Sequence, residues 1–262
     1  MTTITSREND TVKEFCKLSS SKKRRDETGC FALESMKLVL EAYENGVSIE
    51  KVFLTDTALQ KYREKLFELL NSGVRICIIS EEVSRKMTLT DSPQGVFAVC
   101  KKLDKSFPAD KIKHMGIYAA LCGLQDPGNI GTILRTAEAF GVRGVIVSTS
   151  CCDLYNPKVL RASMGTVFRL PVWVSADFCG TLKSFSAAGM PTYAAVVNES
   201  VQSLTDIDFG GKGVAVIGNE GNGLPQEVAD CCDVQMTIRM AGKTESLNAA
   251  MAAGIILWEM TR

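Results

Sequence analysis

The stretch Val216-Ile-Gly-Asn-Glu-Gly-Asn-Gly-Leu224 leads from a short apolar run directly into a glycine-rich turn. Glycine lets a backbone approach a ligand closely or adopt positive φ, so a turn of this kind suits a small-molecule pocket. A second stretch, Glu245-Ser-Leu-Asn248, opens an apolar run that ends at Trp258. Together the two stretches predict a cofactor pocket in the last third of the chain.

Apolar strands and helices alternate around this turn from Ile117 onward. The expected strands are residues 117–122, 144–147, 171–174, 193–197, 214–218 and 234–238, and the expected helices are residues 130–140, a segment near Pro157 and residues 246–260. This alternation predicts an α/β domain with a mainly parallel sheet covered by helices. Ligands bind such sheets beyond the carboxyl ends of the strands, where residues 126–129, residues 218–220 and the loop after Ile238 all fall.

A smaller α/β unit is expected before residue 101. Helices are predicted at residues 33–43, ended by Gly46, and at 58–70, with strands at 52–54, 75–79 and 95–100. Residues 101–113 hold five lysines, a proline and two aspartates, a composition typical of a linker. The sequence therefore predicts an arm at 1–29, a domain at 30–104, a linker at 105–113 and a second domain at 114–262.

Charge gives no global sign of a nucleic-acid partner, because the 262 residues contain 30 Lys and Arg against 30 Asp and Glu. RNA contacts would need local patches. The arm at residues 1–29 supplies one candidate, Lys22-Lys-Arg-Arg25. A solvated surface helix and an RNA-contacting segment both fit such a run of charges, and the sequence leaves both open.

Cysteine and histidine usage argues against a metal site. The ten cysteines include no Cys-x-x-Cys pair, and His114 is the single histidine, so we expect no zinc and no other metal. There is no leader-like apolar segment at the start and no stretch of membrane-spanning length. We therefore expect a cytoplasmic protein with reduced thiols.

Three common enzyme classes are disfavoured by spacing. The glycine turn differs in spacing and position from a dinucleotide-binding loop. The run Ala241-Gly-Lys-Thr244 imitates the end of a phosphate-binding loop, yet Thr237 stands where its first glycine belongs. A Gly-x-Ser-x-Gly elbow is absent, so serine hydrolysis is a poor interpretation.

The polar residues of the conspicuous stretches are rich in hydrogen-bonding groups and poor in nucleophiles. They are Asn129, Arg135, Glu220, Ser246 and Asn248. Such a set suits the alignment of two substrates for direct group transfer.

Three ordered stretches resemble the motifs of one enzyme family. They are Asp126-Pro-Gly-Asn-Ile-Gly131 followed by Arg135, then Ile217 to Leu224, then Glu245-Ser-Leu-Asn248. In order and spacing they are similar to the motifs of the SpoU (TrmH) family, RNA ribose 2′-O-methyltransferases of the SPOUT superfamily. The resemblance covers residues 113–262.

The earlier region is similar to the substrate-binding domain of the same family, which has a fold like that of ribosomal protein L30e. Phe31-Ala-Leu-Glu34 carries this likeness. Family members usually have a glycine directly after that glutamate, where this chain has Ser35.

The resemblance implies a trefoil knot near the carboxyl end, a bent S-adenosylmethionine (S-adenosyl-L-methionine) and a homodimer with its active site close to the subunit interface. The implied cofactor-binding residues are Gly218, Ile238 and Leu247. The implied catalytic and RNA-binding residues are Asn129, Arg135, Glu220, Ser246 and Asn248, and Arg161 is a candidate for contact with RNA phosphate.

Methyl transfer from a sulfonium needs neither a metal nor a covalent intermediate, only alignment of an oxygen and management of its proton. Arg135 is the candidate for the proton, either as a base with a depressed pKa or as a cation that stabilises the developing oxyanion. Ribosomal RNA is favoured as substrate because of the separate recognition domain. The alternatives are tRNA, a base or small-molecule methyltransferase, and a non-catalytic RNA-binding or ribosome assembly protein.

Overall fold

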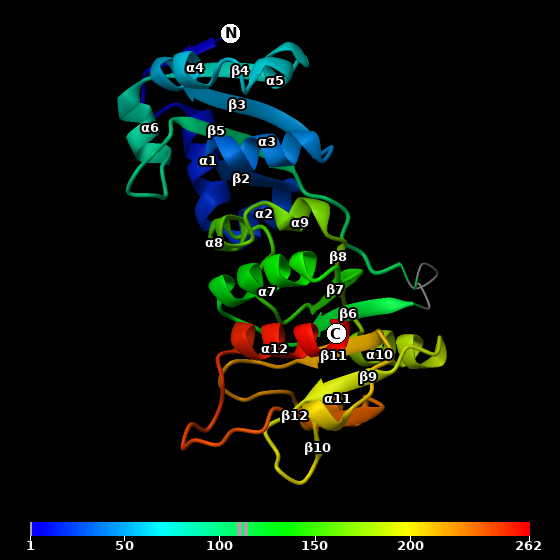
Figure 1. Ribbon diagram of the computed structural model, residues 1–262. Helices are drawn as coiled ribbons and strands as arrows, with labels where there is room; N and C mark the ends of the chain where they lie inside the picture. Colours follow the sequence, from blue (N-terminus) through cyan, green and yellow to red (C-terminus); the bar gives the residue numbers. More distant parts are fainter. Residues whose placement is uncertain (1, 109–111, 113–114) are drawn as a thin grey trace. The chain divides into compact units, whose positions relative to one another are not determined.

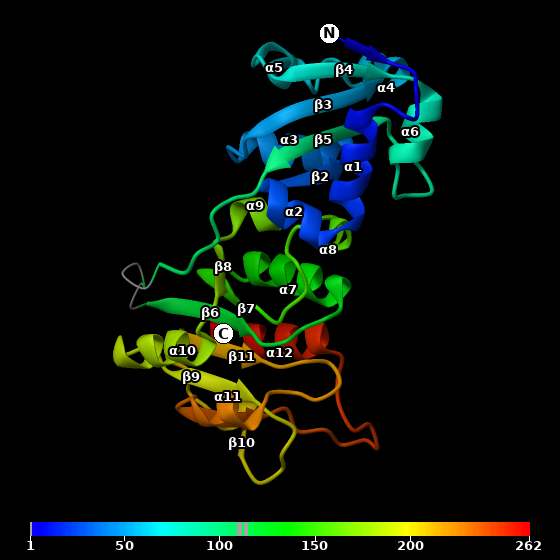
Figure 2. The ribbon, with the colours of Figure 1, turned by 180° about the vertical axis from the view of Figure 1, so that it is seen from behind.

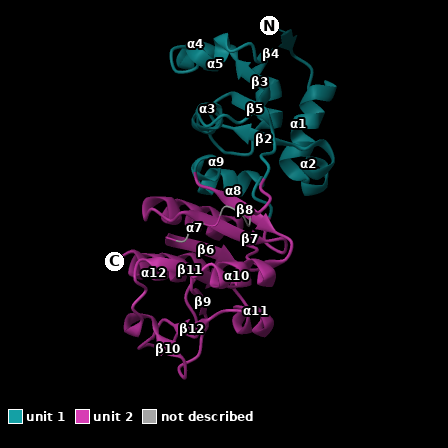
Figure 3. Ribbon diagram, turned by 90° about the vertical axis from the view of Figure 1, so that its right-hand side faces the viewer, with its two compact units in different colours: residues 1–104, 153–169 teal, residues 105–152, 170–262 magenta. Residues whose placement is uncertain are grey.

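The computed structural model describes residues 2–108, 112 and 115–262, which divide into two compact units (Figures 1 and 3). Unit 1 contains the chain up to Asp104 together with Asp153–Arg169, and unit 2 contains Lys105–Cys152 and Leu170–Arg262. Residues 109–111 and 113 of the expected linker, and His114, lie outside the described residues.

Unit 2 is built on a parallel sheet, as predicted. Its strands are β6 (Gly116–Leu121), β7 (Gly144–Ser148), β8 (Val172–Ser175), β9 (Thr192–Ala195), β10 (Gln202–Ser203), β11 (Lys212–Ile217) and β12 (Val234–Thr237). They lie in the order β10-β12-β9-β11-β6-β7-β8, and each described pairing is parallel. The carboxyl ends of β9, β11 and β12 therefore meet at one edge of the sheet.

Helices cover both faces of this sheet (Figures 1 and 2). They are α7 (Pro127–Ala139), α10 (Phe178–Ala187), α11 (Gln226–Asp230) and α12 (Ala249–Thr261), with a short 3₁₀ turn, η2 (Leu204–Asp206). Tyr118 and Val216 share a hydrophobic cluster with Phe185 of α10. Successive residues of a strand point to opposite faces of the sheet, so the residues adjacent to Tyr118 and Val216 face the other side. On that side α12 contacts β6 and β11 and packs along α7.

Unit 1 contains a mixed five-stranded sheet in the order β1-β4-β3-β5-β2. The strands are β1 (Thr2–Ile4), β2 (Cys30–Glu34), β3 (Ile49–Thr55), β4 (Arg75–Ile79) and β5 (Val96–Lys101). The helices are α1 (Asp10–Ser20), α2 (Lys22–Thr28), α3 (Met36–Glu44), α4 (Asp56–Tyr62), α5 (Phe67–Asn71), α6 (Glu81–Met87), α8 (Pro157–Ala162) and α9 (Thr166–Arg169).

The segment expected to be a basic arm is part of unit 1. Val12, Phe15 and Leu18 recur at helical spacing and are buried in α1. The Phe15 ring packs edge-on against Phe53 and Phe97, with centroids 5.9 and 5.5 Å apart. The segment was predicted to be a polar arm because charged residues dominate its composition. Residues 2–29 instead fold as part of unit 1, with the apolar stripe of α1 in its core.

Two predicted helices also differ. Leu33 belongs to β2, so the helix expected from residue 33 begins only at Met36 as α3. The helix expected at 58–70 is divided into α4 and α5, because the chain between them, residues 63–66, forms turns.

Asp153–Arg169 was assigned to the second domain but packs in unit 1. The rings of Tyr155 and Phe168 lie 4.6 and 6.0 Å from that of Phe31. The Tyr155 hydroxyl also donates to the carbonyl oxygen of Leu103 at 3.2 Å. Burial of these aromatic rings, which sequence proximity does not reveal, decides where the segment belongs.

No helix in the described ranges is both long and apolar enough to cross a bilayer.

Candidate active site

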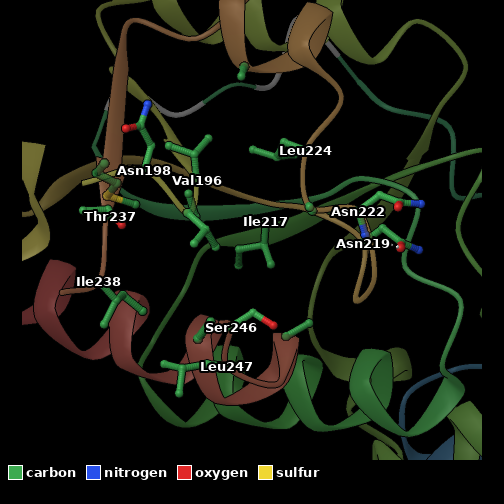
Figure 4. A pocket seen from close by; sticks show the side chains of 18 of the residues that line it. Val196, Asn198, Ile217, Asn219, Asn222, Leu224, Thr237, Ile238, Ser246 and Leu247 are labelled. Atoms are coloured by element: carbon green, nitrogen blue, oxygen red, sulfur yellow. Dashed lines mark hydrogen bonds between the residues drawn. The ribbon is translucent and has the colours of Figure 1, made fainter. Parts of the chain in front are cut away.

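A cavity of about 510 Å³ opens in unit 2 where β9, β11 and β12 end (Figure 4). Four segments line it: residues 195–198, residues 217–224, residues 235–238 with Met240, and residues 245–247 with Ala249. Further lining residues are Leu204, Gln226, Ala229, Ala252 and Ile256. In Figure 4, Val196, Ile217 and Leu224 present apolar side chains to this space, with Ser246 and Leu247 on its other side. The volume is ordinary for a site that holds one small organic ligand.

The glycine turn after β11 is closed by its own backbone. Asn219 N donates to Gly223 O at 2.9 Å, and Gly223 N donates to Asn219 O at 3.0 Å. A Cβ atom on Gly218 would lie 2.2 Å from the carbonyl carbon of Gly223. Gly218 is therefore required by the close approach of two backbone segments, and Gly223 by its φ of +67°.

Glu220 is held by the first motif. Its two carboxylate oxygens accept from the backbone N–H groups of Gln125 at 3.2 Å and Asp126 at 3.1 Å, and from Nδ2 of Asn129 at 3.0 Å. Burial alone raises the pKa of Glu220, but the surrounding donors, led by the Asn129 amide, hold the pKa below its ordinary value. The carboxylate is therefore ionised at neutral pH and accepts hydrogen bonds from the first motif.

Asn129 and Asn248 connect the first and third motifs. Asn248 Nδ2 donates to Asn129 Oδ1 at 2.9 Å, while Asn248 Oδ1 accepts from Ala250 N and Met251 N at 2.9 and 3.2 Å. Asn248 is thus the N-cap of α12, so the helix begins three residues later than the predicted Ser246. Glu220, Asn129 and Asn248 form one hydrogen-bonded chain across three distant stretches.

The structure brings most predicted site residues together, but in two groups. Gly218, Glu220, Ile238, Ser246 and Leu247 line the cavity. The amides of Asn129 and Asn248 lie behind Glu220 and are not part of that lining.

Arg135 stands apart from the cavity. It lies on the exposed side of α7, and no hydrogen bond or ion pair to it occurs among the described residues. Asn129 is six positions earlier, about 240° around the helix, so the two side chains point in different directions.

The basic cluster at residues 22–25 is divided by the fold. Lys22 and Lys23 are exposed, whereas Arg24 forms a bidentate pair with Glu14 at 2.8 and 2.9 Å. Arg25 is 3% exposed and donates to Asp153 and to the carbonyl oxygen of Leu18. The assignment of Arg25 to RNA binding is therefore corrected, because its guanidinium is committed inside unit 1.

Arg161 lies on α8 and is partly buried in unit 1. Its Nη1 atom is buried and has no hydrogen-bond partner within the described part of the chain. A buried, unpaired guanidinium nitrogen is costly, so this atom suits an acceptor supplied by a bound molecule.

Sequence reasoning missed the cavity wall formed by residues 195–198 after β9. No motif marks this segment. The only available signal was the position of the strand end itself, since ligands collect there on parallel sheets.

Comparison with known proteins decides the family. The family model of the SpoU rRNA Methylase family matches residues 116–258, and the MRM3-like substrate binding domain matches residues 9–98. The chain belongs to the SpoU rRNA methylase family. The second match begins inside the segment that the sequence had set apart as an arm.

Similar proteins extend over nearly the whole chain. An uncharacterized tRNA/rRNA methyltransferase of Synechocystis is 35% identical over 99% of this chain and 93% of the relative. The 23S rRNA (guanosine(2553)-2′-O)-methyltransferase RlmP of Bacillus subtilis is 28% identical over 99% of each chain.

Solved structures show the same likeness. The AdoMet-bound rRNA methyltransferase from Sinorhizobium meliloti superposes with a TM-score of 0.86 at 32% identity, covering 98% of this chain and 96% of that one. The SpoU methyltransferase AviRb from Streptomyces viridochromogenes, in complex with AdoMet, gives a TM-score of 0.86 at 26% identity and 97% coverage of both. The SpoU family member described here is an S-adenosylmethionine-dependent RNA methyltransferase.

Proposed function

We propose that this SpoU methylase transfers a methyl group to the 2′-hydroxyl of a ribose in ribosomal RNA of the 23S type. The observation that carries the proposal is the hydrogen-bonded chain from Glu220 through Asn129 to Asn248, directly beside a ligand-sized cavity. Two relatives whose names specify 23S rRNA 2′-O-methylation, from Bacillus subtilis and Streptomyces viridochromogenes, align over 99% of this chain.

Gly218, Ile238 and Leu247 hold the cofactor in this proposal. Their support is that all three line the cavity, where the glycine turn faces apolar side chains. S-adenosylmethionine supplies a methyl group already activated by its sulfonium, so the protein needs to align and deprotonate an oxygen.

Asn129, Glu220, Ser246 and Asn248 orient the substrate side. The ionised Glu220 accepts from Nδ2 of Asn129, and Asn248 donates to Oδ1 of Asn129. The Asn129 amide is therefore held at both of its polar atoms. The Ser246 hydroxyl borders the cavity and makes no hydrogen bond within the described part of the chain, which leaves it free to bind a ligand oxygen.

Arg135 manages the proton of the attacking hydroxyl, either as base or as stabiliser of the oxyanion. Because Arg135 does not line the cavity of its own chain, this role requires a second subunit. We therefore propose a homodimer that covers α12 beside α7. The support is an apolar stripe at helical spacing on α12, where Met251, Ile255 and Trp258 are 61%, 39% and 55% exposed.

RNA contacts are assigned to Lys22, Lys23 and Arg161. The two lysines are exposed on α2, and Arg161 has the unpaired Nη1. The finer fold features belong to the same proposal: a trefoil knot in the carboxyl-terminal part of unit 2, and an L30e-like fold in unit 1. Their support is the likeness to solved SpoU structures over almost the full chain.

A cytoplasmic location is also proposed. All ten cysteines are free, and five of them, Cys100 and Cys151 included, are buried. Reduced thiols of this kind are usual in a reducing compartment.

The test is to map 2′-O-methyl groups in total RNA from cells with and without the gene, together with methylation of purified rRNA by the pure protein. We expect one 23S-type ribose to lose its methyl group when the gene is absent. A methyl group that disappears from tRNA instead, or from a base, would contradict the proposed substrate.

A further inference from the structure

Asn219, which was not among the predicted site residues, ties the turn after β11 to the first motif. Its Nδ2 donates to the carbonyl oxygen of Gly123 at 2.8 Å, across 96 residues of chain. The same nitrogen donates to Oε2 of Glu220 at 3.3 Å. One amide group therefore contacts both the loop that precedes α7 and the anchoring carboxylate.

The remaining polar atoms of Asn219 shape the turn that borders the cavity (Figure 4). Oδ1 accepts from Gly221 N at 2.9 Å and from Asn222 N at 3.3 Å. Its backbone N–H and carbonyl pair with Gly223. Every donor and acceptor group of this residue is engaged: three bond within the turn, and the fourth, Nδ2, donates to Gly123 and Glu220.

We propose that Asn219 is a positioning residue that couples the cofactor cavity to the Asn129 amide through Glu220. A ligand that orders the turn at residues 219–223 fixes Oδ1 of Asn219, and with it the direction of Nδ2. That nitrogen fixes Oε2 of Glu220, whose other oxygen holds Asn129. The inference rests on the proposed methyl transfer, because it gives the cofactor-binding turn a role in orienting the substrate.

The chemistry of an amide explains the residue type. Asparagine offers an acceptor to the turn and a donor to Gly123 and Glu220 at the same time. An aspartate keeps the acceptor but places a second carboxylate 3.3 Å from Glu220. Two such carboxylates raise the pKa of one of them, and the protonated oxygen can then donate in place of Nδ2. Lowering the pH should therefore restore the link in an aspartate variant.

The experiment compares Asn219→Asp with the wild type by RNA methylation at saturating cofactor and RNA, and by calorimetric titration of cofactor. We expect kcat to fall about tenfold near pH 8, the effect of one lost hydrogen bond and an added repulsion. The ratio of variant to wild-type kcat should rise toward one as the pH falls to about 6, because the added proton restores the donor. Cofactor Kd should change by less than about threefold.

Gln202→Glu is the matched control. It makes the same amide-to-carboxylate change on β10 of the same unit, at an exposed position outside the cavity lining. Its kcat ratio should stay near one and should not vary with pH.

Asn219→Ser provides an independent variant. Serine can still cap the turn, but its hydroxyl is too short to reach Gly123, so kcat should fall without recovery at low pH. If Asn219→Asp fails to fold, Asn219→Ser alone tests the proposal, which requires a lower kcat with a nearly unchanged cofactor Kd. Wild-type kcat in both variants, or a weaker cofactor affinity with unchanged kcat, would overturn the role of Asn219. An inactive wild type would instead remove the proposed function.

Discussion

Arg25 Nε lies 2.7 Å from Oδ2 of Asp153, so an ion pair joins residues 128 positions apart inside unit 1. The side chains are 3% and 10% exposed, and Arg25 Nη1 also donates to Leu18 O at 2.6 Å. The pair holds the start of the segment Asp153–Arg169 against α2. In the sequence, Asp153–Arg169 lies between β7 and β8, two strands of the parallel sheet of unit 2, but it packs in unit 1.

Removal of this arginine should destabilise the protein strongly. Arg25→Met removes the cation of a buried ion pair, and breaking such a pair typically costs about 3–5 kcal/mol. Urea unfolding followed by circular dichroism measures the loss. Arg24→Met is the control, because Arg24 is 39% exposed and its pair with Glu14 contributes at most about 1 kcal/mol. Equal effects of the two substitutions would contradict the structural assignment of Arg25.

Glu220 should act as an ionised anchor. Glu220→Gln replaces one accepting oxygen by an NH₂ group that faces donors, so we expect kcat to fall about 100-fold. The folded pKa of Glu220 is depressed, so its contribution to stability is present above the unfolded value of 4.5 and is lost as the pH falls through the folded pKa.

Acid titration of stability checks the second part of this expectation. The stability advantage of wild type over Glu220→Gln should shrink when the pH is lowered below about 4.5 and should be constant between about pH 6 and 8. An advantage that instead disappears near neutral pH would mean that the pKa of Glu220 is raised rather than lowered.

Arg135 should require a guanidinium. Arg135→Lys is expected to lower kcat about 100-fold, since lysine lacks the planar fork that arginine offers to an oxyanion. Cofactor Kd, measured by calorimetry, should be unchanged because Arg135 does not line the cavity. Arg143→Lys, an exposed arginine of the same unit, should retain full turnover. Near-normal turnover of Arg135→Lys would make a specific guanidinium role untenable.

The apolar stripe on α12 should be the surface that a second copy covers. Ile255→Glu places a charge between Met251 and Trp258 and should convert a dimer to monomers in light scattering, with loss of methylation. Ala187→Glu adds the same charge to an exposed position of α10 and should leave the molecular mass unchanged. A wild type that is monomeric at micromolar concentration would refute the dimer.

Ser35 should carry backbone strain. It has φ of 101°, a conformation that suits glycine, and its hydroxyl oxygen accepts from Leu38 N at the start of α3. Ser35→Gly relieves about 1–3 kcal/mol of strain and loses only a few tenths of a kcal/mol of capping, so stability should rise. Ser35→Ala keeps the strain and loses the cap, so it should be less stable than wild type. The urea unfolding midpoint should be highest for Ser35→Gly and lowest for Ser35→Ala. Any other order would contradict backbone strain at Ser35.

The sequence predicted the parallel sheet of unit 2 well because its central strands are short apolar runs that are buried almost throughout. The strand expected at residues 144–147 is β7, which ends one residue later at Ser148, and the three motifs were correctly expected at strand ends that meet. The burial of Arg25 and the break between α4 and α5 were not predictable, since both depend on packing partners remote in the chain. Likewise, α12 begins after Asn248 rather than at Ser246, because Oδ1 of Asn248 caps the helix while its Nδ2 bonds to Asn129 in another segment.

By itself the sequence determined the family, the cofactor and the identity of the polar residues, because ordered motifs and their spacing are properties of the chain. Only the tertiary structure decided which partners those residues have and how far each is buried. It made Glu220 an ionised anchor by gathering N–H donors around it, and it left Arg135 on an exposed helix face. It also showed Asn219 as the link between the motifs. The physical reason is that hydrogen bonds and burial depend on distances between atoms, and those distances are set when segments 90 or more residues apart pack together.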